Sequence, residues 1–291
     1  MRAGALSPAH YRWLRFLRDL DLDPDRLPRP VTPPSDRDFI ICGAPRSGTT
    51  LAAAVLFQPP SVVTVSEPWD GLRLPPDELF RSVRAELATG VLRRGRLDVR
   101  ALTEEGTVRW CRDGELPVRV HTSGDVVVGV KWPAFWRYVD LLPDTRFVVC
   151  VRAPGEVVRS CKEKRGRLIM GFDYRVAFNR EMNAELRRAA RTSAERRVLL
   201  YEYINSRLLG HLDRPNVYVL RYERWFREPE QVIRELSSFL GVPLGPGYAR
   251  IRARGSSTSL SRTEIRMLEQ HSSAARALGY AVERSEAEVV A

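Results

Sequence analysis

A glycine-bounded loop, GAPRSGTT, occupies residues 43–50 and follows an apolar run of strand length at residues 39–42. Alanine-rich residues 51–56 come next, so the segment is predicted to be a strand, a turn and a helix. Backbone N–H groups at the start of a helix lack intrahelical partners and lie at the positive end of the helix dipole. Such turns bind anions, and Gly43 and Gly48 let the backbone approach a phosphate closely. The loop is therefore predicted to bind a phosphate.

The cation of the loop indicates which class of phosphate compound the loop binds. The nucleotide triphosphatase pattern GxxxxGK[ST] has a Lys that reaches the β- and γ-phosphates and a hydroxyl that holds magnesium. Here Thr49 replaces that Lys, and the cation of the loop is Arg46. The later strand, predicted at residues 146–151, ends in Arg152 rather than in the Asp that completes a magnesium site. Both differences argue against phosphoryl transfer from ATP, and a degenerate P-loop kinase or NTPase is kept as an alternative.

Three motifs occur in order along the chain: APRSGTT at residues 44–50, GVKWP at residues 129–133, and RFVVCVRAPGEVVRSCKEKRG at residues 146–166. Together they resemble the sulfotransferases that use 3′-phosphoadenosine 5′-phosphosulfate (PAPS). The similarity is greatest to the bacterial and tyrosylprotein or carbohydrate branch, and it runs from about residue 38 to the closing LGY at residues 278–280. The resemblance implies an enzyme that moves a sulfuryl group from PAPS to a hydroxyl acceptor and releases 3′-phosphoadenosine 5′-phosphate (PAP).

The resemblance also implies which residues hold the donor. Arg152, at the end of a strand, and Ser160, eight residues later, are expected to hold the 3′-phosphate. Tyr222, in LRYERW, matches the Tyr-Glu segment of the family and is expected to contact the adenosine, with a half-buried aromatic as the alternative. The loop residues expected to hold the 5′-phosphosulfate are Arg46, Ser47, Gly48, Thr49 and Thr50.

Sulfuryl transfer needs positive charge near the atom on which negative charge develops. By analogy with phosphoryl transfer, an acceptor oxygen attacks the sulfur in line with the departing 5′-phosphate, and charge grows on the leaving oxygen. Fixed cations stabilise such charge, and the motifs assign this role to Arg46 and Lys131. No metal is required in this scheme.

A general base is also needed, and Glu67 is the candidate. It comes just past a short predicted strand at residues 62–65. The tyrosylprotein-like branch has a Glu there, whereas the cytosolic branch has a His two residues after the Lys, where this chain has Pro133. A local cap or salt bridge is the alternative role for Glu67. The fallback bases are His121 and Asp70.

Alternating strands and helices predict the α/β class: a P-loop-type parallel β-sheet flanked by helices on both faces, with the ligand at the carboxyl ends of the strands. Predicted strands cover residues 39–42, 62–65, 126–130, 146–151 and 217–220. Predicted helices cover residues 51–56, 135–141, 156 onward, 174–210, 229–240 and 261–278, and an insertion at residues 76–112 is predicted to be mostly helical.

We expect a single sulfotransferase domain over residues 1–291, with an N-terminal helix and Pro-rich link at residues 1–37. Residues 70–125 and 172–210 are expected to line the acceptor site. Trp69, Trp132, Phe135 and Trp136 could contact an acceptor there or belong to the core. The acceptor could be a phenol, a sugar, a lipid headgroup or a natural-product alcohol. A noncatalytic nucleotide-binding protein of the same fold is the second alternative.

The net charge is +11, and of the 47 basic residues only Lys131, Lys162 and Lys164 are lysines. The arginines are spread along the chain without a helix-turn-helix, zinc or RNA-recognition pattern, so nucleic acid is not expected as a partner. The first residues contain no long apolar stretch, and a cytoplasmic protein without a membrane span is expected. The arginine-rich composition suggests a high-GC bacterium and a tailoring role in secondary metabolism. The oligomeric state has no signal in the sequence.

Overall fold

A computed structural model of the chain describes residues 36–68, 71, 74, 76–89, 100–102, 108–110, 125–163, 169–172, 179–246, 251 and 258–281. A five-stranded parallel sheet with the strand order β2-β5-β1-β6-β7 contains much of the core. Its strands are β1 (Phe39–Gly43), β2 (Val62–Ser66), β5 (Val127–Lys131), β6 (Arg146–Val151) and β7 (Val217–Arg221). The inner strands are apolar almost throughout, as expected when both faces of a parallel sheet are covered. The predicted α/β class is confirmed.

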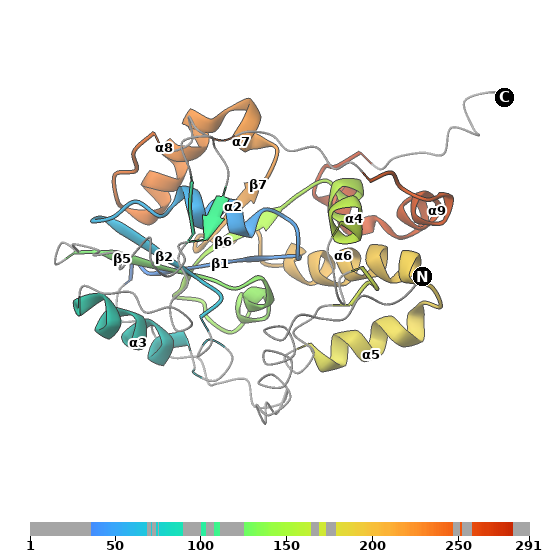
Figure 1. Ribbon diagram of the computed structural model, residues 1–291, viewed down its shortest axis with the longest axis horizontal. Coiled ribbons are helices and arrows are strands. Elements are labelled where there is room, and N and C mark those ends of the chain that lie inside the picture. Colours follow the sequence, from blue (N-terminus) through green and yellow to red (C-terminus); the bar gives the residue numbers. More distant parts are fainter. Residues whose placement is uncertain are drawn as a thin grey trace. The chain divides into compact units, whose positions relative to one another are not determined.

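Helices cover both faces of the sheet (Figure 1). On one face, α2 (Thr49–Val55), α7 (Arg224–Arg227) and α8 (Pro229–Leu240) share a buried apolar cluster with β1, β6 and β7. On the other face lie α3 (Pro76–Ala88) and the 3-10 helix η2 (Pro133–Tyr138). The arrangement buries the strands and leaves their carboxyl ends for the loops that carry the predicted site.

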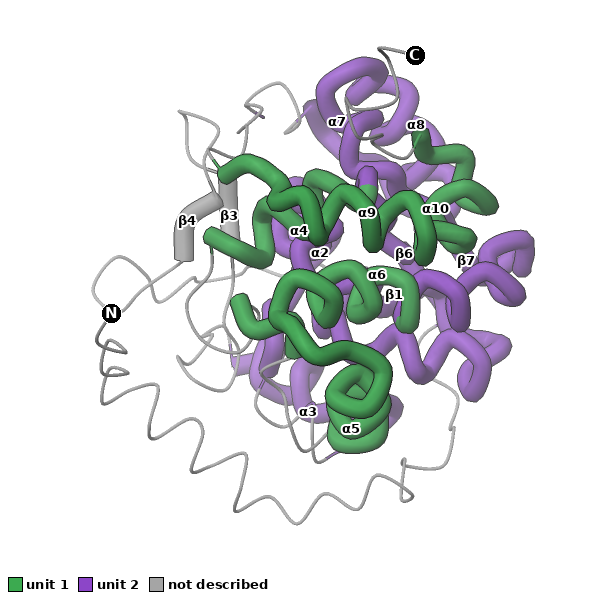
Figure 2. Tube along the Cα trace, turned by 90° about the vertical axis from the view of Figure 1, so that its right-hand side faces the viewer, with its two compact units in different colours: residues 1–27, 154–203, 256–291 green, residues 28–153, 204–255 purple. Residues whose placement is uncertain are grey.

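Two compact units make up the chain (Figure 2). Unit 2 comprises residues 28–153 and 204–255 and contains the whole sheet; unit 1 comprises residues 1–27, 154–203 and 256–291. The boundary between them falls inside α6 (Ser193–Leu209). The expectation of a single domain stays a prediction. The other described helices of unit 1 are α4 (Pro154–Lys162), α5 (Arg180–Ala189), α9 (Arg262–His271) and α10 (Ser273–Ala277).

The prediction of a mostly helical insertion at residues 76–112 is wrong in part. After α3, the described segments include an antiparallel hairpin of β3 (Arg100–Leu102) and β4 (Val108–Trp110), which lies beside α2. Strands of three residues are too short for the alternation of apolar and polar residues to reveal them. The helix predicted around residues 135–141 is the shorter 3-10 helix η2.

The long helical stretch predicted to residue 210 is broken between α5 and α6. Ala190 is extended, and α6 begins after a reciprocal cap: Thr192 Oγ1 accepts from the backbone N–H of Glu195, and Glu195 Oε2 accepts from that of Thr192. The pattern Thr-x-x-Glu is a sequence signature of a helix start and was missed. The helix predicted at residues 261–278 is also two helices, α9 and α10, separated at Ser272.

Several predictions fall outside the described residues. They include the N-terminal helix, most of the Pro-rich link, the possible acceptor contact Trp69, and the fallback bases Asp70 and His121. Within the part of the chain that the structure describes, no helix combines the length and the apolar character needed to cross a membrane.

Candidate active site

The predicted site residues of unit 2 all lie at the carboxyl edge of the sheet. Parallel strands end at the same edge, where ligands bind in open α/β sheets. The strand order therefore sets the order of the side chains along this edge. From one side to the other they are Glu67 after β2, Lys131 at the end of β5, the loop after β1, Arg152 after β6 and Tyr222 after β7.

The loop after β1 requires glycine at both of its ends. Gly43 has a φ of 137°, and a Cβ there would lie 2.3 Å from the carbonyl oxygen of Cys150. Gly48 has a φ of 97°, and a Cβ there would lie 2.5 Å from Cδ2 of Tyr222. Neighbouring residues as well as the backbone conformation thus exclude a side chain at either position. The sequence pattern located these glycines, but it did not reveal their close approach to β6 and to Tyr222 after β7.

Ser47 and Thr49 are buried within this loop, whereas Arg46 and Thr50 are partly exposed. The backbone N–H of Ser47 donates to Ala44 O over 3.1 Å. Among the described residues, Ser47 Oγ has no hydrogen-bond partner. An unpaired buried hydroxyl costs free energy, so this atom is suited to an oxygen of a bound ligand.

Two residues of the edge have a left-handed backbone. Arg46 has a φ of 76° and Glu67 a φ of 51°, and within the described part of the chain they are the non-glycine residues with positive φ. This conformation costs an L-residue about 1–2 kcal/mol. Such costs persist where the surrounding structure imposes them, and they concentrate at functional sites. Both residues were predicted as catalytic from motifs alone.

Glu67 and Lys131 form an ion pair, with Glu67 Oε1 2.5 Å from Lys131 Nζ. The side chain of Lys131 is 2% exposed and that of Glu67 19% exposed. The backbone connects the same two residues, because the N–H of Glu67 donates to Lys131 O over 2.8 Å. The candidate base and a candidate catalytic cation are therefore in direct contact, at the ends of adjacent strands.

Arg152 is 8% exposed and lies between two elements of the edge. Its Nη1 donates to Arg46 O over 3.4 Å, and its Cζ lies 4.2 Å from the ring centroid of Tyr222. Glu223 also contacts this region, because its Oε1 accepts from the backbone N–H of Ala153 over 2.8 Å. Sequence reasoning missed Glu223, although it directly follows Tyr222 in the LRYERW segment.

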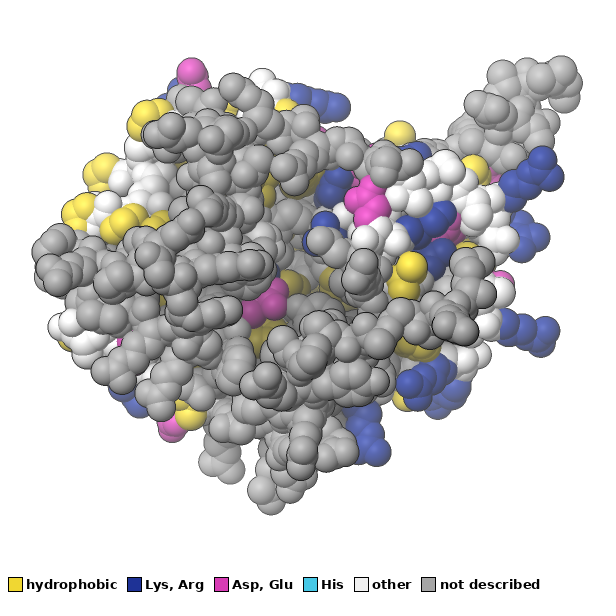
Figure 3. Space-filling view, viewed as in Figure 1, with side chains coloured by type: hydrophobic (Ala, Val, Ile, Leu, Met, Phe, Trp, Pro, Cys, Tyr) yellow, Lys and Arg dark blue, Asp and Glu magenta, His cyan; other side chains and the backbone are white. Residues whose placement is uncertain are grey.

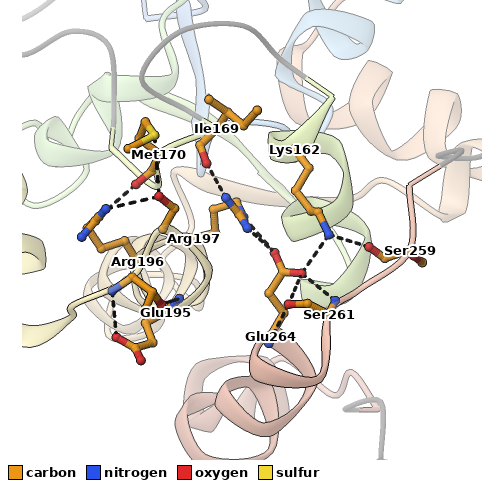
Figure 4. Close-up of polar contacts among 11 residues, drawn as sticks. Lys162, Ile169, Met170, Glu195, Arg196, Arg197, Ser259, Ser261 and Glu264 are labelled. Carbon is orange, nitrogen blue, oxygen red and sulfur yellow. Dashed lines mark hydrogen bonds and ion pairs between the residues drawn. The ribbon is translucent and has the colours of Figure 1, made fainter. Parts of the chain in front are cut away.

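Ser160 belongs to α4, in unit 1, where it is buried. The pairing of Ser160 with Arg152 at a 3′-phosphate stays a prediction. At the end of the same helix, Lys162 Nζ donates to Ser259 O over 2.6 Å and to Glu264 Oε2 over 3.0 Å (Figure 4). This cluster was not predicted.

Glu264 is the centre of the cluster and is fully buried. It caps α9 reciprocally with Ser261, and its Oε1 lies 2.7 Å from Nη2 of Arg197 in α6. Burial raises the pKa of the Glu264 carboxyl, but hydrogen bonds from Ser261, Lys162 and Arg197 outweigh burial and lower that pKa below 4.5. Arg197 also donates to Ile169 O. These contacts join α4, α6 and α9 within unit 1.

Trp132 and Phe135, which were considered for acceptor binding, and Arg84 of the insertion have structural partners in unit 2. Trp132 and Phe135 are each 1% exposed, and Trp132 Nε1 donates to Pro68 O over 3.1 Å, so both belong to the core. Arg84 of α3 makes a bidentate contact with Asp38, at 2.6 and 3.1 Å. These contacts anchor the insertion to the sheet.

Exposed basic side chains gather over the surface of unit 1 formed by α5, α6 and α9 (Figure 3). On α5 the exposed members are Arg180, Arg187 and Arg188. The described residues contain no group of three or more His, Cys, Asp or Glu side chains arranged to hold a metal ion.

Comparison with known proteins places this geometry in a family. A family model described as "Sulfotransferase family" matches residues 38–246. A solved sulfotransferase from Alicyclobacillus acidocaldarius is 19% identical, with 90% of this chain and 98% of that chain covered and a TM-score of 0.45. The sulfotransferase domain of the curacin biosynthetic pathway is 16% identical, with 87% and 100% covered and a TM-score of 0.45. A mouse sulfotransferase complexed with PAP is 14% identical, with 80% and 73% covered and a TM-score of 0.36. No curated protein matches the chain in sequence.

Proposed function

The chain belongs to the sulfotransferase family, whose model matches it over residues 38–246, and on that premise we propose that it transfers a sulfuryl group from PAPS to a hydroxyl acceptor. The observation that carries the proposal is the line of Glu67, Lys131, the loop after β1 and Arg152 along one edge of the sheet. A base, two cations and an anion-binding loop are the groups that this reaction needs.

The residues of the edge fit the donor at its 5′ end. The loop offers backbone N–H groups, the buried Ser47 Oγ, and glycine positions at which neighbouring chain excludes a side chain. At the other end of the donor, the Arg152 guanidinium is a planar cation suited to a phosphate. When bound, PAPS supplies the sulfuryl group and a phosphate leaving group. We assign the 5′-phosphosulfate to the loop and the 3′-phosphate to Arg152 and Ser160.

The catalytic roles follow from charge. Arg46 and Lys131 stabilise the negative charge that grows on the leaving oxygen, which preorganised cations do at little reorganisation cost. Glu67 accepts the proton of the acceptor hydroxyl. Because these side chains provide the positive charge, the reaction is proposed to proceed without a metal.

The Glu67–Lys131 pair has a consequence for this mechanism. Glu67 Oε1 lies 2.5 Å from the Lys131 ammonium, so the proposed base and the proposed cation contact each other directly. A donor phosphosulfate beside Lys131 competes with Glu67 for the same ammonium. We therefore propose that donor binding weakens the contact between Glu67 and Lys131 and that the donor binds before Glu67 Oε1 accepts the proton of the acceptor hydroxyl.

The acceptor is proposed to be a small hydroxyl compound, such as a phenol, a sugar or a natural-product alcohol. The segments proposed to line its site are residues 70–125 and 172–210. We further propose a cytoplasmic bacterial enzyme of secondary metabolism that needs neither nucleic acid nor a membrane.

Calorimetric titration with PAP in EDTA tests the donor site. Wild type is expected to bind PAP without metal, and Arg152→Ala is expected to bind it at least about tenfold more weakly, because a charge-assisted contact is lost. ATP with magnesium is the control ligand. A preference for magnesium-ATP over PAP would favour the degenerate kinase instead and overturn the proposal.

An acceptor screen with PAPS then tests transfer. Glu67→Ala serves as the inactive control, and release of PAP that depends on both the acceptor and Glu67 supports the mechanism. Tight PAP binding with no transfer to any hydroxyl class would favour the noncatalytic nucleotide-binding alternative.

A further inference from the structure

The position of Arg152 is set by two residues that follow β7, Tyr222 and Glu223. We propose that these two are positioning residues that hold the Arg152 guanidinium for the 3′-phosphate and thereby set the preference for a 3′-phosphorylated donor. The inference rests on the proposed function, in which Arg152 binds that phosphate.

Tyr222 forms a platform under Arg152. The guanidinium lies 4.2 Å from the ring centroid, a distance at which a cation and an aromatic face attract each other. Phe226 also packs against the ring, with centroids 5.2 Å apart, and helps to fix it. The backbone N–H of Tyr222 donates to Val151 O over 2.8 Å. This bond fixes the backbone of Tyr222 to the last residue of β6.

The same ring touches the phosphate loop. A Cβ at Gly48 would lie 2.5 Å from Tyr222 Cδ2, so the backbone of the loop lies directly against the ring. The ring thus lies against both the loop and Arg152. One side chain thereby connects the positions proposed for the two phosphate groups of the donor.

Glu223 fixes the backbone at the residue that follows Arg152. Its Oε1 accepts from the N–H of Ala153, the residue after Arg152, over 2.8 Å. Together with the bond from Tyr222 to Val151, this contact holds the backbone on both sides of Arg152. A long arginine side chain otherwise loses considerable conformational entropy when it binds, and a fixed backbone and a ring platform reduce that loss.

The test compares two ligands that differ only in the 3′-phosphate: PAP and adenosine 5′-phosphate. The measured quantity is the ratio of their dissociation constants. Wild type is expected to prefer PAP strongly, and Arg152→Ala is expected to abolish the preference. Tyr222→Leu and Glu223→Ala are expected to lower the ratio about tenfold each, with the affinity for adenosine 5′-phosphate nearly unchanged.

Conservative variants separate positioning from direct contact. Tyr222→Phe keeps the ring, and Glu223→Gln keeps an oxygen that accepts from Ala153, so both are expected to retain the wild-type ratio. Tyr218→Leu, the same substitution four residues earlier and within β7, controls for general damage to the strand and is also expected to retain the wild-type ratio. If Glu223→Ala fails to fold, Glu223→Asp, which retracts the carboxylate by one methylene, tests the same contact.

Three outcomes are decisive. Folded Tyr222→Leu and Glu223→Ala variants with the wild-type ratio would overturn the inference. Equal weakening of both ligands by Tyr222→Leu would also overturn it for Tyr222, because the ring would then serve the adenosine. A wild type that does not distinguish the two ligands would instead refute the proposed function.

Discussion

Glu67 and Glu264 are both carboxylates paired with a lysine, one in each unit, and they differ in what surrounds the pair. Glu67 contacts Lys131 from a left-handed backbone position, and its side chain is 19% exposed. Glu264 contacts Lys162 from the first turn of a regular helix, is fully buried, and also receives hydrogen bonds from Arg197 and Ser261.

The difference shows how one chemical pair serves two purposes. Around Glu264, several donors satisfy both oxygens and the backbone is relaxed, so the pair joins helices and has little left to offer a ligand. Around Glu67, the backbone is strained and the carboxylate is partly accessible, so the pair can exchange partners. Backbone strain and solvent access, rather than the presence of an ion pair, distinguish Glu67, the proposed base, from Glu264.

The largest effect is expected from Glu67→Gln, which tests whether Glu67 acts in catalysis rather than in stability. The amide still accepts from Lys131 but cannot take a proton, so the turnover number is expected to fall about 10²–10⁴-fold. The free energy of unfolding is expected to change by less than about 1 kcal/mol. Steady-state kinetics and urea unfolding measure the two effects. A large loss of stability with activity retained would reverse the assigned role.

Glu264→Gln is the matched substitution in unit 1. Removing one partner of a buried pair leaves charge uncompensated, so the free energy of unfolding is expected to fall by about 3 kcal/mol. Urea unfolding of wild type and variant measures this loss. An unchanged unfolding midpoint would show that the cluster contributes no stability. The structural role assigned to Glu264, and with it the difference from Glu67, would then be wrong.

The contribution of Glu264 to the free energy of unfolding is expected to depend on pH. Its carboxyl has a lower pKa in the folded protein than its ordinary value of 4.5. The folded state therefore binds fewer protons, and the stabilisation is present above about pH 4.5 and is lost as the pH falls through the folded pKa. The stability difference between wild type and Glu264→Gln is expected to shrink below about pH 4.5. Parallel loss of stability in both proteins would contradict this.

The smallest expected effect concerns the left-handed backbone at Arg46. Arg46→Ala and Arg46→Gly both remove the side chain, but only glycine relieves the positive φ. The glycine variant is expected to be more stable than the alanine variant by about 1 kcal/mol. At Arg188, in helix α5, the order should reverse by a similar amount. Thermal unfolding of the four variants measures both differences, and the same order at both positions would refute strain at Arg46.

Sequence reasoning could predict the sheet and its site because both are local patterns. The apolar strands, the glycine-bounded loop and the residues at strand ends follow from composition and spacing, and the order of motifs indicated the family. The contacts of Gly48 and Glu223 could not be predicted in this way, since they join residues more than 60 positions apart. The hairpin of β3 and β4 was missed because its strands are too short to show a period.

The strand order has a consequence for how the acceptor contacts of such a protein can evolve. Most of the proposed donor contacts of unit 2 lie after β1, β6 and β7, whereas Glu67, the proposed base, lies after β2, on the opposite side of β1. One uninterrupted stretch of chain, residues 67–126, runs between β2 and β5. Residues 70–125, part of the region proposed to line the acceptor site, lie within this stretch. Substitutions there would change the proposed acceptor contacts and leave the proposed donor contacts after β1, β6 and β7 unchanged.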